Sequence, residues 1–151
     1  MACEFHIGEY TYRAKSMDAF TQMSVTAKIS PLIASGFAEL LPFAVKLRKD
    51  GIKNIADLPL KEAAAMLGPV AREMVKMPDE DRRYVISACL SLCERNKDGA
   101  QGWEPIWNHA AVISNQSDIQ SDMILMLRIT IGVIHGTLSN FSLGDLLTSF
   151  G

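Results

Sequence analysis

The sequence lacks the features that mark several common classes of protein. Its 151 residues carry 15 lysines and arginines against 17 acidic residues, a formal charge of −2, so no basic excess is available to bind nucleic-acid phosphates. The longest apolar run, MILMLRITIGVI at 123–134, is shorter than a membrane span and contains Arg128. The basic start and apolar run of a signal peptide are also missing. We therefore expect no nucleic-acid partner, no membrane insertion and a cytoplasmic location.

Motifs for chemistry are equally scarce. There is no P-loop, dinucleotide fingerprint, G-x-S-x-G or H-E-x-x-H sequence. Three cysteines, an odd number, make no disulfide framework and favour a reducing compartment. Cys89 and Cys93 are four residues apart on a predicted helix, but they lie on its apolar stripe without the further ligands that structural zinc needs. We expect core packing, no cofactor, no metal and no catalytic residue; a thiol-dependent enzyme or redox protein using this pair is the alternative.

The opening residues CEFHIGEYTYRA predict a β-hairpin over 1–15. Apolar and polar residues alternate, and a two-residue turn at Gly8 and Glu9 pairs Phe5 with Tyr12 on one apolar face. An isolated hairpin is only marginally stable, so we expect this one to lie on the helices that follow.

Helical periodicity dominates the rest of the chain, which predicts one compact, mainly α domain of about six helices with the small N-terminal β-hairpin packed on it. The first predicted helix runs from Ser16 or Asp18 to Ile29, with Phe20, Met23 and Ala27 on its core stripe, and the second runs from Pro31 to Lys49 and is kinked or split at Pro42. Two short helices separated at Gly68 and Pro69 follow. The remaining predicted helices lie over 79–97, over 117–138, capped by Ser117, and at 142–150. The single domain thus divides into the hairpin at 1–15, helices at 16–97, a tryptophan-containing loop at 98–116 and C-terminal helices at 117–151.

Gly132 and Gly136 lie one turn apart in the helix predicted over 117–138. They would let another helix approach closely, either within the chain or in a homo-oligomer. The β-branched stretch ITIGVI leaves a strand as the alternative to a helix here.

Both tryptophans, Trp103 and Trp107, fall in the segment GAQGWEPIWN at 99–108. Pro105 between them argues against a continuous helix, so we expect an irregular or extended segment. No acid, base or nucleophile motif surrounds the two rings. We interpret them as a clamp that fastens the loop onto the helices, with contact to a binding partner as the alternative.

The C-terminal third is a second candidate surface for a partner. From Pro105 onwards the only charged residues are Asp118, Asp122, Arg128 and Asp145, which indicates burial in the core or under another protein. Methionines adapt to varied partners, although they also fill gaps in helical cores, the interpretation that we favour. The partner-binding candidates are Trp103, Trp107, Met123, Met126 and Phe141.

Three stretches together resemble the tail assembly chaperones of long-tailed bacteriophages and prophages. They are FHIGEYTYRAKSMDAFTQM, CLSLCERNKDGAQGWEPIWN and GTLSNF. The resemblance implies a mainly helical, non-enzymatic protein that binds the tape-measure protein and keeps it soluble until tail-tube subunits, a second class of partner, polymerise around it. It also implies absence from the mature virion and, in many members, a longer form made by ribosomal frameshifting. A structural tail component is the remaining alternative.

Overall fold

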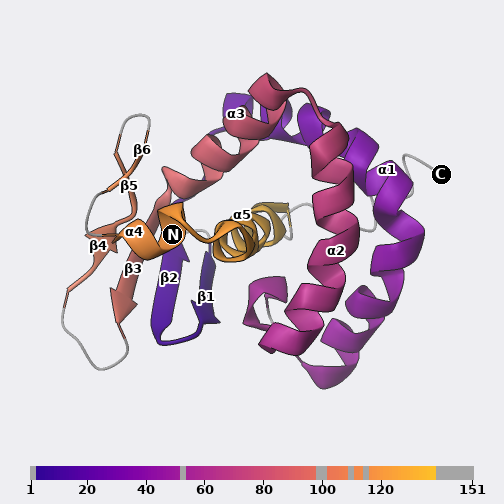
Figure 1. Ribbon diagram of the computed structural model, residues 1–151, viewed down its shortest axis with the longest axis horizontal. Coiled ribbons are helices and arrows are strands. Elements are labelled where there is room, and N and C mark those ends of the chain that lie inside the picture. The colour runs from indigo at the N-terminus through magenta and orange to yellow at the C-terminus, as the bar shows by residue number, and fades with distance from the viewer. Residues whose placement is uncertain (1–2, 52–53, 98–101, 109–110, 114–115, 139–151) are drawn as a thin grey trace.

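The computed structural model describes residues 3–51, 54–97, 102–108, 111–113 and 116–138, with side chains except at 33–48, 55 and 138. This part of the chain is mainly helical, with five α-helices, one 3₁₀ helix and six short strands (Figure 1). In order they are β1 (Cys3–Ile7), β2 (Tyr10–Ala14), α1 (Ala19–Asp50), the 3₁₀ helix η1 (Ile55–Asp57), α2 (Leu60–Lys76), α3 (Asp79–Leu90), β3 (Cys93–Lys97), β4 (Glu104–Pro105), β5 (Trp107–Asn108), β6 (Ala111–Val112), α4 (Ser117–Gln120) and α5 (Met123–Leu138).

The N-terminal hairpin is confirmed in its register. Phe5 pairs with Tyr12 and His6 with Thr11, around a turn where Gly8 has a φ of 62°, a left-handed conformation that glycine adopts most easily. The hairpin belongs to a larger sheet, however, with the strand order β1-β2-β3-β4. A second sheet joins β5 and β6.

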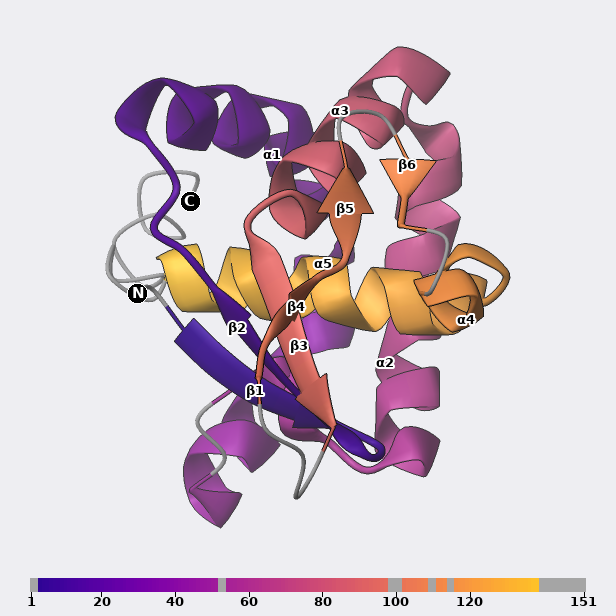
Figure 2. The same cartoon turned by 90° about the vertical axis from the view of Figure 1, so that its left-hand side faces the viewer.

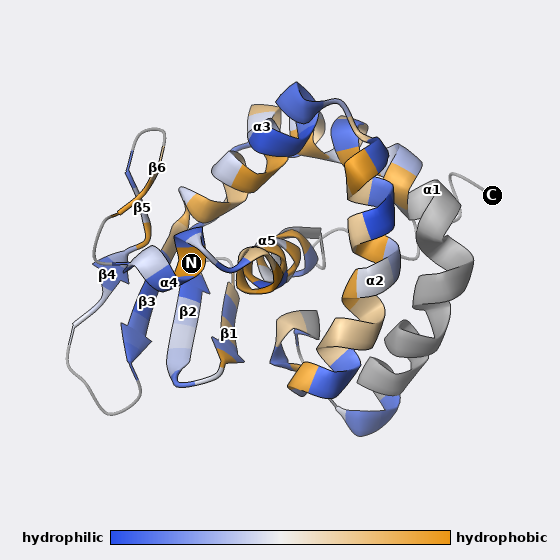
Figure 3. Cartoon of the chain, viewed as in Figure 1, coloured by the Kyte–Doolittle hydropathy of each residue, from blue (hydrophilic) through white to orange (hydrophobic). Residues whose placement is uncertain are grey.

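Helix α5 crosses the middle of the molecule, between the four-stranded sheet and helices α2 and α3 (Figures 1 and 2). Its Ile129 and Val133 are fully buried in the main core, together with Phe5 from the sheet and Val85 from α3. Leu127, on another side of α5, is buried in a second core with residues of α2. Burial on several sides explains why this helix is apolar along most of its length (Figure 3).

Helix α1 is continuous from Ala19 to Asp50, so the break predicted at Ser30 and Pro31 is wrong. Of the kink or split predicted at Pro42, the split is wrong as well. Proline has no N–H to donate to the carbonyl four residues earlier, which for Pro31 is that of Ala27. The Ser30 hydroxyl donates to this carbonyl at 3.1 Å instead. The acceptor therefore stays satisfied, and α1 changes direction rather than ending (Figure 1).

Helix α2 is likewise continuous through Gly68 and Pro69, where the sequence predicted two short helices. The carbonyl left without a donor by Pro69 belongs to Ala65, which is exposed, so water can hydrate it. The buried side chains along the opposite side are Ala63, Met66, Leu67, Val70 and Met74. Each larger one contributes about 1.5–3 kcal/mol on burial, which together exceeds the roughly 3 kcal/mol that a proline costs a helix.

The helix predicted over 79–97 is also wrong in its second half. Helix α3 ends at Leu90, and the chain continues as strand β3, which pairs with β2. Cys93 and Arg95 are both buried, and the residues that alternate with them are more exposed. Arg95, expected near a helix terminus, lies inside the sheet, where its guanidinium pairs with Asp118 as described below.

The helix predicted over 117–138 is two helices, α4 and α5. Helix α4 begins at Ser117 without a side-chain cap bond, so the cap expected from Ser117 is absent. Asp122 caps α5 instead, because its carboxylate accepts hydrogen bonds of 3.1 Å from the N–H groups of Ile124 and Leu125. The stretch ITIGVI lies within α5, so the strand alternative is wrong. The helix predicted at 142–150 lies outside the described residues.

Gly132 and Gly136 do permit a close approach, but to strand β1 and the η1 segment rather than to another helix. A Cβ atom on Gly132 would lie 2.9 Å from the Cβ of Ala56 and 3.0 Å from the ring of Phe5. A Cβ on Gly136 would collide with the side chain of Cys3. The contact therefore lies within one chain and needs no second copy.

The Gly136→Ala variant should lower the free energy of unfolding by about 1–3 kcal/mol, because the added methyl group overpacks the contact with β1. Gly68→Ala is the matched control: nothing lies within 4 Å of its Cβ position, so it should raise the stability of α2 by up to about 1 kcal/mol. Chemical denaturation measures both changes. Equal stability of the two variants would contradict the close packing of α5 on β1.

Candidate functional site: a groove between α1, α3 and β5

The first turns of α1 expose the apolar side that the sequence assigned to the core. Phe20 is 81% exposed and Met23 is 60% exposed, and Ala27 on the same side is exposed as well. Among the described side chains of this helix, the buried ones are instead Val25 and Ile29. The prediction failed because the two stripes lie on opposite sides of one helix and both are apolar.

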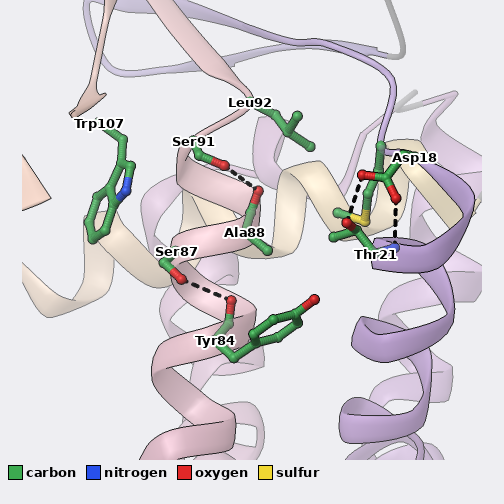
Figure 4. Close-up of a pocket in the computed structure, with 9 residues that line it drawn as sticks. Asp18, Thr21, Tyr84, Ser87, Ala88, Ser91, Leu92 and Trp107 are labelled. Atoms are coloured by element: carbon green, nitrogen blue, oxygen red, sulfur yellow. Dashed lines mark hydrogen bonds between the residues drawn. The ribbon is translucent and has the colours of Figure 1, made fainter. Parts of the chain in front are cut away.

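A groove lies between the start of α1, the outer side of α3 and strand β5 (Figure 4), and Phe20 and Met23 are not among its lining residues. Its volume is about 290 Å³. The lining residues are Met17, Asp18, Thr21, Tyr84, Ser87, Ala88, Ser91, Leu92 and Trp107. The α3 residues lie between Trp107 on one side and the α1 residues on the other (Figure 4). We call this the α1–α3 groove.

The serine and threonine hydroxyl groups of the groove are already engaged within the chain. Thr21 donates to the Asp18 carboxylate at 2.7 Å, Ser87 to the carbonyl of Tyr84 at 3.1 Å, and Ser91 to the carbonyl of Ala88 at 3.0 Å. Hydrogen bonds from Thr21, chiefly from its backbone N–H, lower the pKa of Asp18. The groove thus offers apolar surface and one carboxylate, and it suits binding of a side chain better than nucleophilic chemistry.

The two tryptophans are separated by the structure. Trp103 lies over the guanidinium of Arg13, 4.2 Å from the ring centroid, and Arg13 pairs with Glu94 at 2.6 Å. Trp107 lies in β5, packs partly buried against the main core and forms one wall of the α1–α3 groove. The expected extended segment is therefore present, with one ring on the sheet and the other at the groove.

Ile106, between the two tryptophans, is the residue that sequence reasoning missed. It is fully buried in the main core, and its backbone N–H donates to the carbonyl of Cys93 at 3.4 Å. A single isoleucine after a proline, between two tryptophans, does not indicate this role in the sequence. Ile106 anchors the segment and thereby places Trp107 at the groove.

The other partner-binding candidates do not join the groove. Met123 is 68% exposed at the start of α5, and Met126 packs partly buried against the main core. Neither lines the α1–α3 groove. Phe141 lies outside the described residues.

Arg95 and Asp118 form an ion pair that the sequence did not indicate. The side chain of Arg95 is only 4% exposed and makes two hydrogen bonds to Asp118, at 2.7 and 2.8 Å. The same guanidinium lies 3.9 Å from the ring centroid of Tyr10 and donates to the Tyr12 hydroxyl at 3.2 Å. The Arg95 hydrogen bonds lower the pKa of Asp118. The pair ties β3 to α4, far apart in the sequence.

The cysteines have the wrong environment for thiol chemistry. Burial raises the pKa of Cys89 to about 12 and that of Cys3 to about 11, and it raises that of Cys93 well above its usual value; a reactive thiol needs a lowered one. Cys3 and Cys93 both pair with Ala14, from opposite sides, so they lie about 9–10 Å apart, too far for a disulfide. No group of three potential metal ligands occurs among the described residues.

Comparison with known families gives one match. Residues 8–147 match the family described as phage tail assembly chaperone protein, TAC, which covers nearly the whole chain. No curated protein and no solved structure gave a match. Among the described helices, none is both long and apolar enough to cross a membrane. The chain therefore belongs to the phage tail assembly chaperone family.

Replacing the tryptophans one at a time separates a clamp from a docking residue. Trp107→Ala should lower the free energy of unfolding by about 2–4 kcal/mol, because its ring packs against the main core. Trp103→Ala should lower it by only about 1 kcal/mol, because it loses a single exposed cation–π contact. Thermal unfolding of both variants gives the comparison. An unchanged stability of Trp107→Ala, combined with lost partner binding, would assign that ring to docking alone.

Alkylation of the folded protein with iodoacetamide at pH 7 should leave Cys89 and Cys93 unmodified, because both thiols are buried and protonated. Both should react once guanidinium chloride unfolds the chain. Cys3, which is half-buried, should react first and slowly, and it serves as the internal reference. Rapid modification of Cys89 in the folded state would revive the thiol-enzyme hypothesis.

Proposed function

We propose that this member of the phage tail assembly chaperone family binds the tape-measure protein as its client and keeps it soluble while the tail forms. The chaperone acts in the cytoplasm of the bacterial host, hands the client over as tail-tube subunits polymerise, and is not retained in the mature virion. The observation that carries the proposal is the α1–α3 groove; the exposed Phe20 and Met23 add apolar surface on another side of α1.

A helical client needs an apolar surface without competing charges. An amphipathic helix presents large side chains at intervals of three and four residues, and such side chains seat in a hydrophobic groove. Among the groove residues only Asp18 is charged, while Met17, Leu92 and Trp107 are apolar. Ser87, Ala88 and Ser91 are small, so a client side chain can reach the surface of α3.

The size of the surface fits a reversible chaperone. Burying Phe20 and Met23 on binding contributes about 1.5–3 kcal/mol each, and filling the groove adds a similar amount. Association itself costs at least about 4 kcal/mol. The net affinity is then modest, which lets the growing tail tube displace the chaperone from its client.

Co-expression with the tape-measure protein tests the proposal. The soluble fraction of the tape-measure protein should rise when the chain is present, and Ser91→Arg should reduce the rise because the long side chain fills the groove. Binding should weaken by at least about tenfold, or 1.4 kcal/mol. Gln120→Arg is the matched control, because it adds the same side chain at an exposed position of α4 outside the groove.

Two results would contradict the proposal. If the tape-measure protein is equally insoluble with and without the chain, the chain is not its chaperone. The chain could instead be found in purified virions, which would make it a structural tail component. Circular dichroism of Ser91→Arg confirms that any lost binding comes from a folded variant.

A further inference from the structure

Asp18 carries an uncompensated negative charge at the α1 end of the α1–α3 groove (Figure 4). Its carboxylate accepts hydrogen bonds from the backbone N–H of Thr21 at 2.9 Å and from the Thr21 hydroxyl at 2.7 Å. Both donors are neutral, so they orient the carboxylate without cancelling its charge. No lysine, arginine or histidine of the described part of the chain forms an ion pair with Asp18. A cation on a bound partner therefore has an open anionic position in the groove.

The serine and threonine hydroxyl groups of the groove offer acceptors rather than donors. Such a hydroxyl has one hydrogen to donate and two lone pairs that accept. Thr21 donates its hydrogen to Asp18, and Ser87 and Ser91 donate theirs to carbonyl oxygens of α3. These groups can therefore offer a bound molecule only the lone pairs of their oxygens. The ammonium of lysine and the guanidinium of arginine donate hydrogen bonds and accept none, so they complement this set.

The rest of the groove suits the hydrocarbon stem of such a side chain. Ala88 and Leu92 lie between Asp18 and the wall formed by Trp107 (Figure 4), and Met17 adds a third aliphatic side chain to the lining. Lysine and arginine lay their methylene groups along apolar surface while the charged head stays in water or at an opposite charge. One long basic side chain can thus contact both the apolar lining and the carboxylate.

A lysine of the chain itself already binds in this way at the border of the groove. The ammonium of Lys28 lies 5.0 Å from the ring centroid of Tyr84, which lines the groove, and 3.2 Å from the carboxylate of Asp81. An aromatic ring attracts a cation in this position. Because Lys28 is paired with Asp81, it leaves the charge of Asp18 uncompensated.

We propose that the α1–α3 groove selects a long basic side chain, a lysine or an arginine, from the client helix, with the charged head at Asp18 and the stem along α3. Because the client supplies this side chain, the inference rests on the proposed function. A glutamate in the same place would bring a second negative charge to Asp18 and would find lone pairs instead of donors at Thr21, Ser87 and Ser91. The apolar lining then supplies contact area, and the carboxylate supplies the choice of charge.

Three synthetic amphipathic helical peptides test the proposal against the purified full chain. They differ only at one central position of the apolar stripe, which holds lysine, norleucine or glutamate; norleucine keeps the unbranched stem without the charge. Fluorescence anisotropy should show the tightest binding for the lysine peptide, about tenfold tighter than for the glutamate peptide. Equal affinity of these two peptides overturns the proposal. Tightest binding of the norleucine peptide would assign the groove to an apolar side chain and overturn it as well.

Asp18→Asn removes the charge but keeps a side-chain oxygen for the Thr21 N–H, and asparagine caps helices about as well as aspartate. It should reduce the preference for lysine over glutamate by about fivefold, with helix content unchanged in circular dichroism. Asp122→Asn is the matched control, because Asp122 caps α5 in the same way outside the groove. It should leave the preference unchanged. An equal reduction in both variants would attribute the preference to net charge and overturn the proposal.

Ser91→Arg distinguishes a failure of this inference from a failure of the proposed function. Suppose that it abolishes binding of the tape-measure protein while the peptides show no preference for lysine. The groove is then the client site, and only its selection of a basic side chain is wrong. If the peptides instead prefer lysine through Asp18 but the tape-measure protein stays insoluble, the proposed client is wrong and the selectivity of the groove is confirmed.

Discussion

The ion pair between the buried Arg95 and the half-exposed Asp118 is the interaction on which the arrangement of the groove depends. A guanidinium inside a sheet is costly unless its hydrogen bonds are met. Here its two terminal nitrogens donate three bonds to Asp118 and Tyr12, and the ring of Tyr10 lies against it, while Nε finds no acceptor among the described residues. The pair fixes β3 within the sheet and holds α4 against it. Because β4 pairs with β3, and Ile106 follows β4 into the core, the same pair also sets the position of Trp107.

The central position of α5 explains why apolar residues are left on the outer helices. α5 is buried on several sides and contacts β1 at a distance that only glycine permits. It therefore fills much of the core by itself, and α1 and α2 each contribute one buried stripe. Phe20 and Met23 on α1, and Leu60 and Val75 on α2, are then surplus to the core. Surplus apolar residues at helical spacing are expected of a protein that exists to bind others.

The sequence predicted the structure correctly where the signal was local. The hairpin register followed from the alternation around Gly8 and Glu9, and the glycines at Gly132 and Gly136 correctly indicated a close contact. It failed where contacts with residues distant in the sequence determine the secondary structure. Helix α2 continues through Pro69 because its buried side packs on α5 and α1, and β3 is a strand because it pairs with β2 of the N-terminal hairpin. Neither fact can be obtained from propensity or period alone.

The same limit applies to the candidate site. Phe20 and Met23 were assigned to the core because periodicity identifies an apolar stripe but not which side of the helix the rest of the chain covers. Trp107 was singled out as a candidate from the sequence, while the groove that it lines depends on α1 and α3, which meet only in the folded chain. A clamp and a docking residue are also not exclusive for Trp107. A ring held rigidly by the core on one side loses little entropy when a client covers its other side. Its stabilising role in the fold is then part of what makes it a good wall for the groove.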